Sequence, residues 1–224
     1  TDGNDNQTTY DIDANRNVTK ITDARGGTQT FAWTEYGQIR ETVDAEGLKT
    51  NQFYDENQNP TLRTVSGTDA SGNAVSITTS TLYDKKFGKP LQTVDGNKNT
   101  TNYTLDAKGN VRSVLLPTGR SILLNYYPNG DISDVTDEYG FITRYTNYDA
   151  RGNPLRIQRE AGSQTIVTTN TFDLRSRLKT TEGTLAPRVS IEYDALDRVI
   201  SQTTTDPTGF QDAVTMTAQY LPEG

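Results

Sequence analysis

The stretch Tyr148–Asn153 reads Tyr-Asp-Ala-Arg-Gly-Asn, and Tyr193–Arg198 repeats it as Tyr-Asp-Ala-Leu-Asp-Arg. Among the first nine copies, most start 21 or 22 residues after the previous one, and two spacings are longer, at 24 and 29 residues. A fixed period of about 20 to 50 residues is typical of stacked arrays, in which each unit buries its apolar face against its neighbours. We therefore expect any function to depend on the array of repeats as a whole and not on a single residue. Weaker copies begin at Ile12, Trp33, Tyr54, Tyr83, Leu105, Tyr126 and Phe172, and a tenth begins at Tyr220.

The copy from Leu105 to Tyr126 shows how one unit is built. Leu105–Asn110 has the composition of a turn, because Asp and Asn bond their own backbone and Gly supplies a positive φ. Val111–Leu116 reads as a strand, Pro117–Gly119 as a second turn, and Ser121–Tyr126 as the returning strand. Two strands of about six residues and two short turns predict a hairpin unit.

Other copies follow the same plan. Apolar residues two positions apart, such as Ile191 and Tyr193, lie on one face of a strand, whereas the opposite faces are rich in Thr, Lys and Asn. We expect the aromatic residues to form a ladder, each packing against the same position one hairpin along. No window has a helical period. The second turn recurs at Asp23–Gly26, Asp44–Gly47, Asp137–Gly140 and Asp206–Gly209.

Two repeats are longer than the others. The extra residues include Ser66–Asn73 in one repeat and Ala161–Ser163 in the other, and both stretches are small and polar. We expect enlarged hairpin loops at the rim of the sheet, which are either tolerated insertions or points of contact with a partner.

The composition is compatible with disorder but favours a β fold. Leu, Ile, Val and Phe together number 44 of 224 residues, which is close to the disordered range. However, the net charge is only −7, and 37 Thr and 12 Tyr suit the pleated surface of strands. Because the repetition continues to the end of the chain, we expect one domain over residues 1–224.

The residue types that are missing exclude several kinds of chemistry. The chain has no Cys and no His, which removes disulfides, thiolates and the commonest general base. No apolar run approaches the ~18 residues that a membrane helix needs. The charge is acidic with both signs interspersed, which argues against nucleic acid and anionic membranes. Thr1–Asn6 resembles no natural start, so we expect a segment of a longer protein.

The full pattern is Tyr-Asp-x-x-Gly-Asn, then apolar residues, Asp-x-x-Gly, and a Thr-rich strand ending in an aromatic residue. It resembles the Rhs/YD-repeat family, which includes Rhs polymorphic toxins, Tc toxin shell subunits, wall-associated proteins and teneurins. The turns at Tyr83–Gly88, with one residue extra, and Tyr54–Gln58, with Gln in place of Gly, depart from the pattern. The motif positions are Tyr54, Asp55, Tyr83, Asp84, Asp106, Gly109, Asn110, Tyr126, Gly130, Tyr148, Asp149, Gly152, Asn153, Phe172, Asp173, Tyr193 and Asp194.

The resemblance implies an all-β fold: a continuous antiparallel sheet of tandem hairpins, curving into an open spiral or partial shell. In larger members the shell encloses a toxic C-terminal domain. The family also has a self-cleaving aspartyl activity that begins with Asp-Pro-x-Gly, and here only Asp206–Gly209 matches it. An ordinary Pro-containing turn explains those four residues, so proteolysis is not carried over.

Candidate catalytic and metal sites are weak. Asp11, Asp13 and Asn15 alternate like a calcium loop, as do Asp55, Asn57 and Asn59, but neither pattern has the Gly and Glu that complete an EF-hand. The acid pairs Asp194/Asp197 and Asp134/Asp137 have the types needed for glycoside hydrolysis, yet they lie in or beside predicted turns. We expect no enzyme activity, no metal and no cofactor.

These observations predict a non-enzymatic segment of a shell that encapsulates a toxic or effector domain, secreted or at the cell surface. The alternative is an extracellular adhesion or carbohydrate-binding module, because Trp33 and the tyrosines could stack on sugar rings. The expected partners are the rest of the shell and an enclosed toxin polypeptide, or a glycan in the alternative. Bare end strands could also pair with a second copy. We expect no nucleic-acid partner and no membrane insertion.

Overall fold

A computed structural model of the chain describes residues 7–184, 186–206 and 212–220. Their regular structure consists of 19 β-strands, each antiparallel to the strands with which it pairs. None of these residues forms a helix of the length and apolarity that a bilayer crossing requires. The predicted all-β fold of tandem antiparallel hairpins is therefore confirmed.

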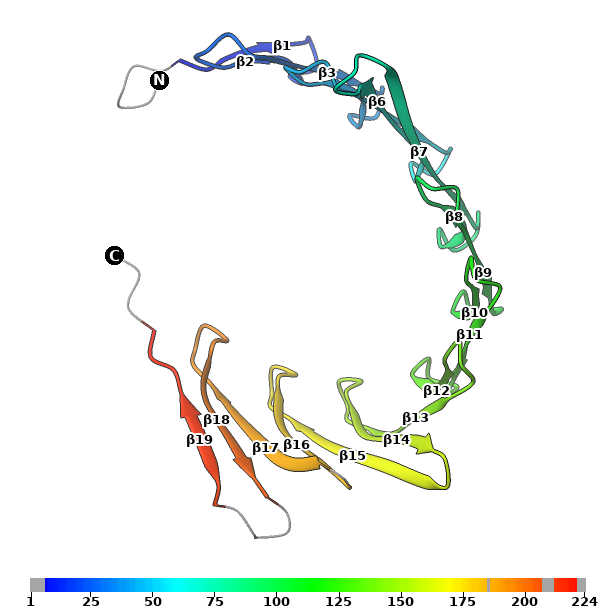
Figure 1. The fold of residues 1–224 in the computed structure, drawn as a ribbon, viewed down its shortest axis with the longest axis vertical. Coiled ribbons are helices and arrows are strands. Elements are labelled where there is room, and N and C mark those ends of the chain that lie inside the picture. Colours follow the sequence, from blue (N-terminus) through cyan, green and yellow to red (C-terminus); the bar gives the residue numbers. More distant parts are fainter. Residues whose placement is uncertain (1–6, 185, 207–211, 221–224) are drawn as a thin grey trace. The chain divides into compact units, whose positions relative to one another are not determined.

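The strands fall into two compact units, Thr1–Gly119 and Arg120–Gly224, and each is described by itself. In the first unit, strands pair in chain order from β1 to β10 (Figure 1). The strands are β1 (Thr9–Ile12), β2 (Val18–Thr22), β3 (Thr28–Trp33), β4 (Ile39–Val43), β5 (Lys49–Tyr54), β6 (Pro60–Thr68), β7 (Ala74–Tyr83), β8 (Pro90–Val94), β9 (Thr100–Leu105) and β10 (Val111–Leu115).

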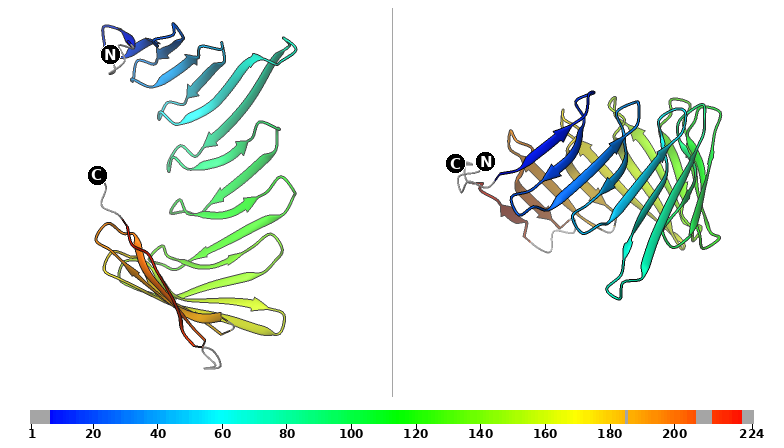
Figure 2. Two further views of the ribbon diagram at one scale, coloured as in Figure 1. Left: turned by 60° about the vertical axis from the view of Figure 1, so that its left-hand side comes forward. Right: turned by 90° about the horizontal axis from the view of Figure 1, so that it is seen from above.

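The second unit repeats this arrangement, with strands pairing in chain order from β11 to β19 (Figure 2). Among the described residues, β1 pairs only with β2 and β19 only with β18. Self-association through these edges, the curvature of the sheet and the single domain stay predictions. The strands are β11 (Ser121–Tyr126), β12 (Ile132–Thr136), β13 (Ile142–Tyr148), β14 (Pro154–Ala161), β15 (Gln164–Phe172), β16 (Leu178–Gly183), β17 (Ala186–Tyr193), β18 (Val199–Thr205) and β19 (Val214–Thr217).

Each unit is a single layer and has no hydrophobic core. No hydrophobic side chain is buried among the residues that the structure describes, and many strand residues are half-buried. Phe53 and Ile77 are more than half exposed, at 54% and 58%. The expectation that each hairpin buries its apolar face against its neighbours was therefore wrong. The physical reason is that burial of a sheet face requires a second layer packed against it, and neither unit supplies one.

The two longer repeats extend strands rather than loops. Ser66–Asn73 was expected to be an enlarged loop, but β6 continues to Thr68 and only Asp69–Asn73 forms the turn. At the second insertion, Ala161 pairs with Gln164, so the connection is two residues long. The loop predictions were wrong because Thr, Val and Ile on both sides favour a paired extended backbone over a long loop.

Two sets of turns alternate along each unit. We call the first set the tyrosine-edge turns; they follow the repeat-start residues and comprise 13–17, 34–38, 55–59, 84–89 and 106–110 in the first unit, and 127–131, 149–153, 173–177 and 194–198 in the second. The opposite-edge turns include 23–27, 44–48, 69–73, 95–99 and 137–141.

Several ladders that the opposite-edge turns close stop short of the tyrosine edge. The β2–β3, β4–β5 and β12–β13 ladders each contain three residue pairs and end at Lys20, Glu41 and Asp134. Each of these residues lies two positions after the start of its strand. Beyond that point the backbones no longer pair, and we call this unpaired region a fork.

An aromatic side chain bridges each of these three forks. The Tyr148 hydroxyl donates to the Ile132 carbonyl at 2.6 Å, and the Tyr54 hydroxyl donates to the Ile39 carbonyl at 2.8 Å. Both acceptors are first residues of a strand, which the ladder leaves unpaired on that side. The bridge therefore ties each hairpin to the one before it. The same bond joins Trp33 Nε1 to Val18, Tyr193 to Leu178 and Tyr220 to Val199.

This arrangement differs from the aromatic ladder that the sequence predicted. Among the described residues, two ring pairs lie close: Phe31 with Trp33, within one strand, and Tyr127 with Tyr148. Neither pair joins the same position of successive hairpins. The prediction was wrong because the rings reach the backbone of the preceding hairpin, where an unpaired carbonyl needs a donor.

Removing the bridging hydroxyl should weaken the sheet. We expect Tyr148→Phe to lower the free energy of unfolding by about 0.5–1.5 kcal/mol, because the Ile132 carbonyl loses its donor. Urea unfolding followed by circular dichroism measures this change. Tyr139→Phe is the matched control, since Tyr139 is 67% exposed and its hydroxyl bonds to none of the described residues. Equal effects of the two substitutions would contradict the bridge.

Candidate functional site: the tyrosine-edge turns

The turn Asp149–Asn153 shows the geometry that the tyrosine-edge turns share. The Asp149 N–H donates to the Asn153 carbonyl at 3.0 Å, and the Gly152 N–H donates to the Asp149 carbonyl at 3.1 Å. Asp149 Oδ1 accepts the N–H groups of Arg151 and Asn153 at 2.9 Å each. Asn153 Nδ2 donates to Oδ2 at 2.9 Å. The carboxylate therefore satisfies two backbone donors that have no strand partner.

The fourth residue of each five-residue turn has a left-handed backbone, and in the six-residue turn 84–89 the fifth residue, Gly88, takes that conformation. Gly152 has φ of 81°, as a type I turn followed by a bulge requires. Arg16, Gln58, Lys98, Ser176 and Asp197 adopt the same region at φ of 62° to 68°. For a residue with a Cβ this conformation costs roughly 1–2 kcal/mol. The Gln58 turn keeps its hydrogen bonds despite the substitution of Gly.

A side-chain lock accompanies every non-glycine residue at this position. In these turns the fifth residue is Asn or Arg, and its side chain bonds to Oδ2 of the opening Asp; the fifth residues are Asn17, Asn59, Asn99, Arg177 and Arg198. Where the described turns lack this lock, as at Gly26, Gly37, Gly47, Gly130 and Gly140, the fourth residue is Gly. The lock offsets the cost of the left-handed backbone.

The structure places the predicted motif residues on this edge. Tyr54, Tyr83, Tyr126, Tyr148, Phe172 and Tyr193 end their strands; Asp55, Asp84, Asp106, Asp149, Asp173 and Asp194 open the turns; Gly109, Gly130 and Gly152 are left-handed; Asn110 and Asn153 close the turns. Whether they share a functional role stays a prediction.

Successive turns also contact each other. In the first unit Gln38 Nε2 donates to the Gln58 carbonyl at 3.1 Å, and Lys85 pairs with Glu56 at 2.9 Å. The extra residue in the 84–89 turn, Phe87, packs over Gly109, where an added Cβ would lie 2.6 Å from its ring. The turns 34–38, 55–59, 84–89 and 106–110 therefore contact one another in succession along the edge.

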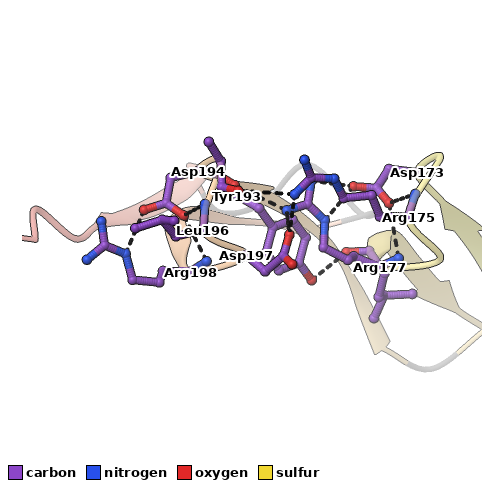
Figure 3. Close-up of polar contacts among 10 residues, drawn as sticks. Asp173, Arg175, Arg177, Tyr193, Asp194, Leu196, Asp197 and Arg198 are labelled. Atoms are coloured by element: carbon purple, nitrogen blue, oxygen red, sulfur yellow. Dashed lines mark hydrogen bonds and ion pairs between the residues drawn. The ribbon is translucent and has the colours of Figure 1, made fainter.

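The strongest of these contacts joins the turns 173–177 and 194–198, shown in Figure 3. Arg177 bonds Asp173 Oδ2 through Nε at 2.7 Å and reaches Asp197 Oδ1 at 2.6 Å. Arg175 reaches the same Asp197 oxygen at 2.8 Å. The Arg177 guanidinium also lies 4.5 Å from the centre of the Tyr193 ring, a cation–π distance. One carboxylate thus joins two arginines of the preceding turn.

The turns hold their carboxylates ionised. The hydrogen bond from the Arg177 side chain lowers the pKa of Asp173 to about 2 from an ordinary value of 3.8. In other turns, bonds from the fifth residue are the largest cause that lowers the pKa; the carboxylates concerned are Asp13, Asp55, Asp69, Asp95, Asp106, Asp149 and Asp194. A carboxylate held in this state accepts bonds and is a poor general acid.

The candidate catalytic and metal residues serve in this network. Asp13 and Asp55 each accept two turn N–H groups. Asp194 accepts the N–H groups of Leu196 and Arg198, and Asp134 accepts Asn125 Nδ2. In the described part of the chain, no group of three or more acidic residues is placed to hold a metal ion. The Asp206–Gly209 match lies largely outside the described residues.

Sequence reasoning missed the locks and the bridges. The lock has a signal, Asp followed four residues later by Asn or Arg, as in Asp173 and Arg177. The bridge has a weaker one, an aromatic residue with a polar hydrogen about 15 residues after an apolar strand start, as in Trp33 and Val18. The lock lies within one turn, whereas the bridge depends on the register between strands, which the sequence does not specify by itself.

No protein-family model and no curated protein matches the chain. Among solved structures, crystal structures of TcdB2–TccC3–TEV and TcdB2–TccC3–Cdc42 match 90% of this chain with TM-scores of 0.56 and 0.57, both at 15% identity. A Photorhabdus luminescens Tc holotoxin pore with a mutated TccC3 matches 90% at a TM-score of 0.50 and 13% identity. The chain spans only 13% to 14% of those chains. The likeness establishes the fold.

Acid should weaken the turns. A carboxylate whose pKa is lowered by folding stabilises the fold above its unfolded pKa, and this stability is lost as the pH falls through the folded value. We therefore expect the urea midpoint to fall between about pH 4 and pH 2. Because the chain has no His, we expect no comparable step between about pH 5 and 8. Asp173→Asn should reduce the acid step. A urea midpoint that stays constant down to about pH 2 would contradict the claim that the locked carboxylates stabilise the fold.

Proposed function

We propose that this chain is a non-enzymatic wall segment of an Rhs/YD-repeat shell that encapsulates a toxic or effector polypeptide. The observation that carries the proposal is the single layer: hairpins pair side by side in both units while no hydrophobic side chain of the described residues is buried. A globular domain of this length would bury a core. A layer without one encloses more space per residue, as a wall requires.

The mechanism of such a wall is containment. Lateral ladders, fork bridges and turn contacts join neighbouring hairpins, so that a protease or a cytosolic target cannot pass between them. The wall needs no reacting group, and the carboxylates of the turns are occupied by backbone donors. The matches to TcdB2–TccC3 structures support this proposal through the fold alone.

The same proposal covers partners and location. The rest of a shell would pair with β1 or β19, each of which has one strand partner among the described residues. A second copy could pair there in its absence. A wall around a delivered toxin would act in a secreted or surface-bound protein and contribute to virulence. No cofactor, nucleic acid or membrane insertion is part of the proposal.

The adhesion alternative requires a defined place for a ligand. One fork of the first unit provides a specific observation in its favour, a cavity lined by exposed aromatic rings.

Limited proteolysis tests containment. The whole reading frame that encodes this chain is expressed, digested with proteinase K and followed by mass spectrometry. We expect a non-repeat polypeptide to survive in the intact protein and to be digested quickly when expressed alone. Opening the wall with Tyr148→Phe and Tyr193→Phe together should speed its digestion about tenfold, because both bridges are lost.

Tyr139→Phe serves as the control and should leave the rate unchanged, since the Tyr139 side chain lies in an opposite-edge turn and bridges no fork. Equal digestion of the non-repeat polypeptide inside and outside the intact protein would refute containment. So would a reading frame that encodes repeats alone.

A further inference from the structure

Two bridges of the second unit carry a cation on the bridging ring. Arg177 directly precedes the carbonyl acceptor of the Tyr193 bridge, and its guanidinium lies 4.5 Å from the centre of the Tyr193 ring (Figure 3). Arg198 precedes the acceptor of the Tyr220 bridge in the same way, and its guanidinium lies 4.2 Å from that ring. The residue before a bridge acceptor therefore lies where a cation can cover the tyrosine.

The Tyr148 bridge of the same unit has a carboxylate at this position. Asp131 directly precedes Ile132, whose carbonyl accepts the Tyr148 hydroxyl. Among the described residues, no Lys or Arg lies over the Tyr148 ring. Asp131 is also the one acid at the end of a tyrosine-edge turn, since the other turns end in Asn17, Gln38, Asn59, Lys89, Asn110, Asn153, Arg177 and Arg198.

A cavity of about 590 Å³ lies at this fork between β12 and β13. Its lining includes Asp131, Tyr127 and Tyr148, all within the second unit. The two rings have their centres 6.3 Å apart and their planes at 81°, and Tyr127 is 37% exposed. Two aromatic rings at one cavity are the walls of an aromatic cage, the kind of site that binds organic cations.

The Asp131 carboxylate supplies a negative charge beside these rings. Its Oδ2 accepts Asn129 Nδ2 at 2.6 Å, whereas Oδ1 accepts no hydrogen bond and joins no ion pair among the described residues. Burial and then the charge of Asp131 raise the pKa of Tyr148, so the carboxylate lies close to that ring. Oδ1 also lies 3.8 Å from the place that a Cβ on Gly152 would take. It therefore faces the next turn.

The charges are arranged differently at the neighbouring fork of Arg177. There the last residue of one turn is the cation, and Asp197, the fourth residue of the next turn, accepts its Nη1 at 2.6 Å. At the β12–β13 fork the last residue is the acid Asp131, and the fourth residue of the next turn is Gly152, which has no side chain. The ring and the carboxylate are present, and the cation is left for another molecule to supply.

The groups at this fork favour a guanidinium over other cations. A planar guanidinium stacks on an aromatic ring and donates in a fork to a carboxylate, whereas a quaternary ammonium group has no N–H to donate. An ammonium group acts as a compact point charge and stacks on no ring. The Arg177 and Arg198 contacts show that this position accommodates a guanidinium. The net charge of −7 attracts a basic segment of a polypeptide.

We propose that the β12–β13 fork binds an arginine side chain of a partner polypeptide, with its guanidinium against the rings of Tyr127 and Tyr148 and bonded to Asp131 Oδ1. The proposal does not depend on containment, because the site needs only the groups of one fork. Failure of either proposal leaves the other standing.

NMR titration of the isotope-labelled 224-residue chain with the peptide acetyl-Gly-Arg-Gly-amide tests the proposal. We expect saturable shifts of the Asp131, Ile132 and Gly152 amides, because these residues surround the carboxylate and the bridge. The same peptide with citrulline has the shape of arginine without its charge and should cause no saturable shift. The lysine peptide should bind at least about threefold more weakly, since its ammonium lacks the planar fork.

Variants of the chain locate the binding. Asp131→Asn should weaken it about tenfold, because the carboxylate is removed while the shape of the side chain is kept. Glu138→Gln is the matched control, since it removes the same charge from an opposite-edge turn of the same unit, and it should bind within about twofold of the unaltered chain. Tyr127→Leu should weaken binding about fivefold and serves if Asp131→Asn alters the circular dichroism.

Three results would overturn the proposal. One is the absence of a saturable shift with the arginine peptide. Another is equal binding of the citrulline or the lysine peptide, which would show that the fork does not select a guanidinium. The third is an equal loss in Asp131→Asn and Glu138→Gln, which would assign the binding to the overall charge of the chain.

Discussion

A single layer of strands has no second layer to bury its side chains, so its order depends on bonds made within the layer. One recurring bond of this kind runs from an aromatic O–H or N–H across a fork to the carbonyl of a strand's first residue. Trp33, Tyr54, Tyr148, Tyr193 and Tyr220 all make it to the first residue of a strand. Without it, the backbone ladder between those hairpins would end with an unsatisfied acceptor.

The hydrogen bonds within the turns are the second set of bonds on which the order of the layer depends. A left-handed fourth residue reverses the chain within five residues, and the opening Asp accepts the donors that the reversal leaves unpaired. Because an Asn or Arg at the fifth position locks that Asp, Gln58 and Asp197 can replace Gly at a position that normally requires it. The sequence can therefore vary at this position while the fold is kept.

The hairpin plan follows from the sequence because its signals are local. Asp149 and Gly152 specify a turn wherever they occur together, and Thr-rich segments between turns favour strands. The bridges and the contacts between turns are not local in this sense: the Tyr148 bond to Ile132 and the Arg177 contact to Asp197 depend on how successive strands align. The stretch Ser66–Asn73 shows a related failure, since its polar composition suggested a loop although its neighbours pair as long strands.

The fold of the chain is similar to that of Tc toxin structures, and many of its polar and aromatic side chains bond to its own backbone. Carboxylates of the turns bind backbone donors, and several aromatic residues bridge forks. At the β4–β5 fork, Tyr36 and Phe53 are more than half exposed.

Amide hydrogen exchange measured residue by residue tests the central claim most directly. If bonds within the layer hold the sheet, the Asn59, Asn110 and Asn153 amides, which donate to turn carboxylates, should exchange as slowly as ladder amides in both units. The protection of backbone amides against exchange should repeat from one hairpin to the next. No small group of strands should be protected more strongly than the rest. Slow exchange confined to a few adjacent strands, with the turn amides exchanging freely, would contradict the account.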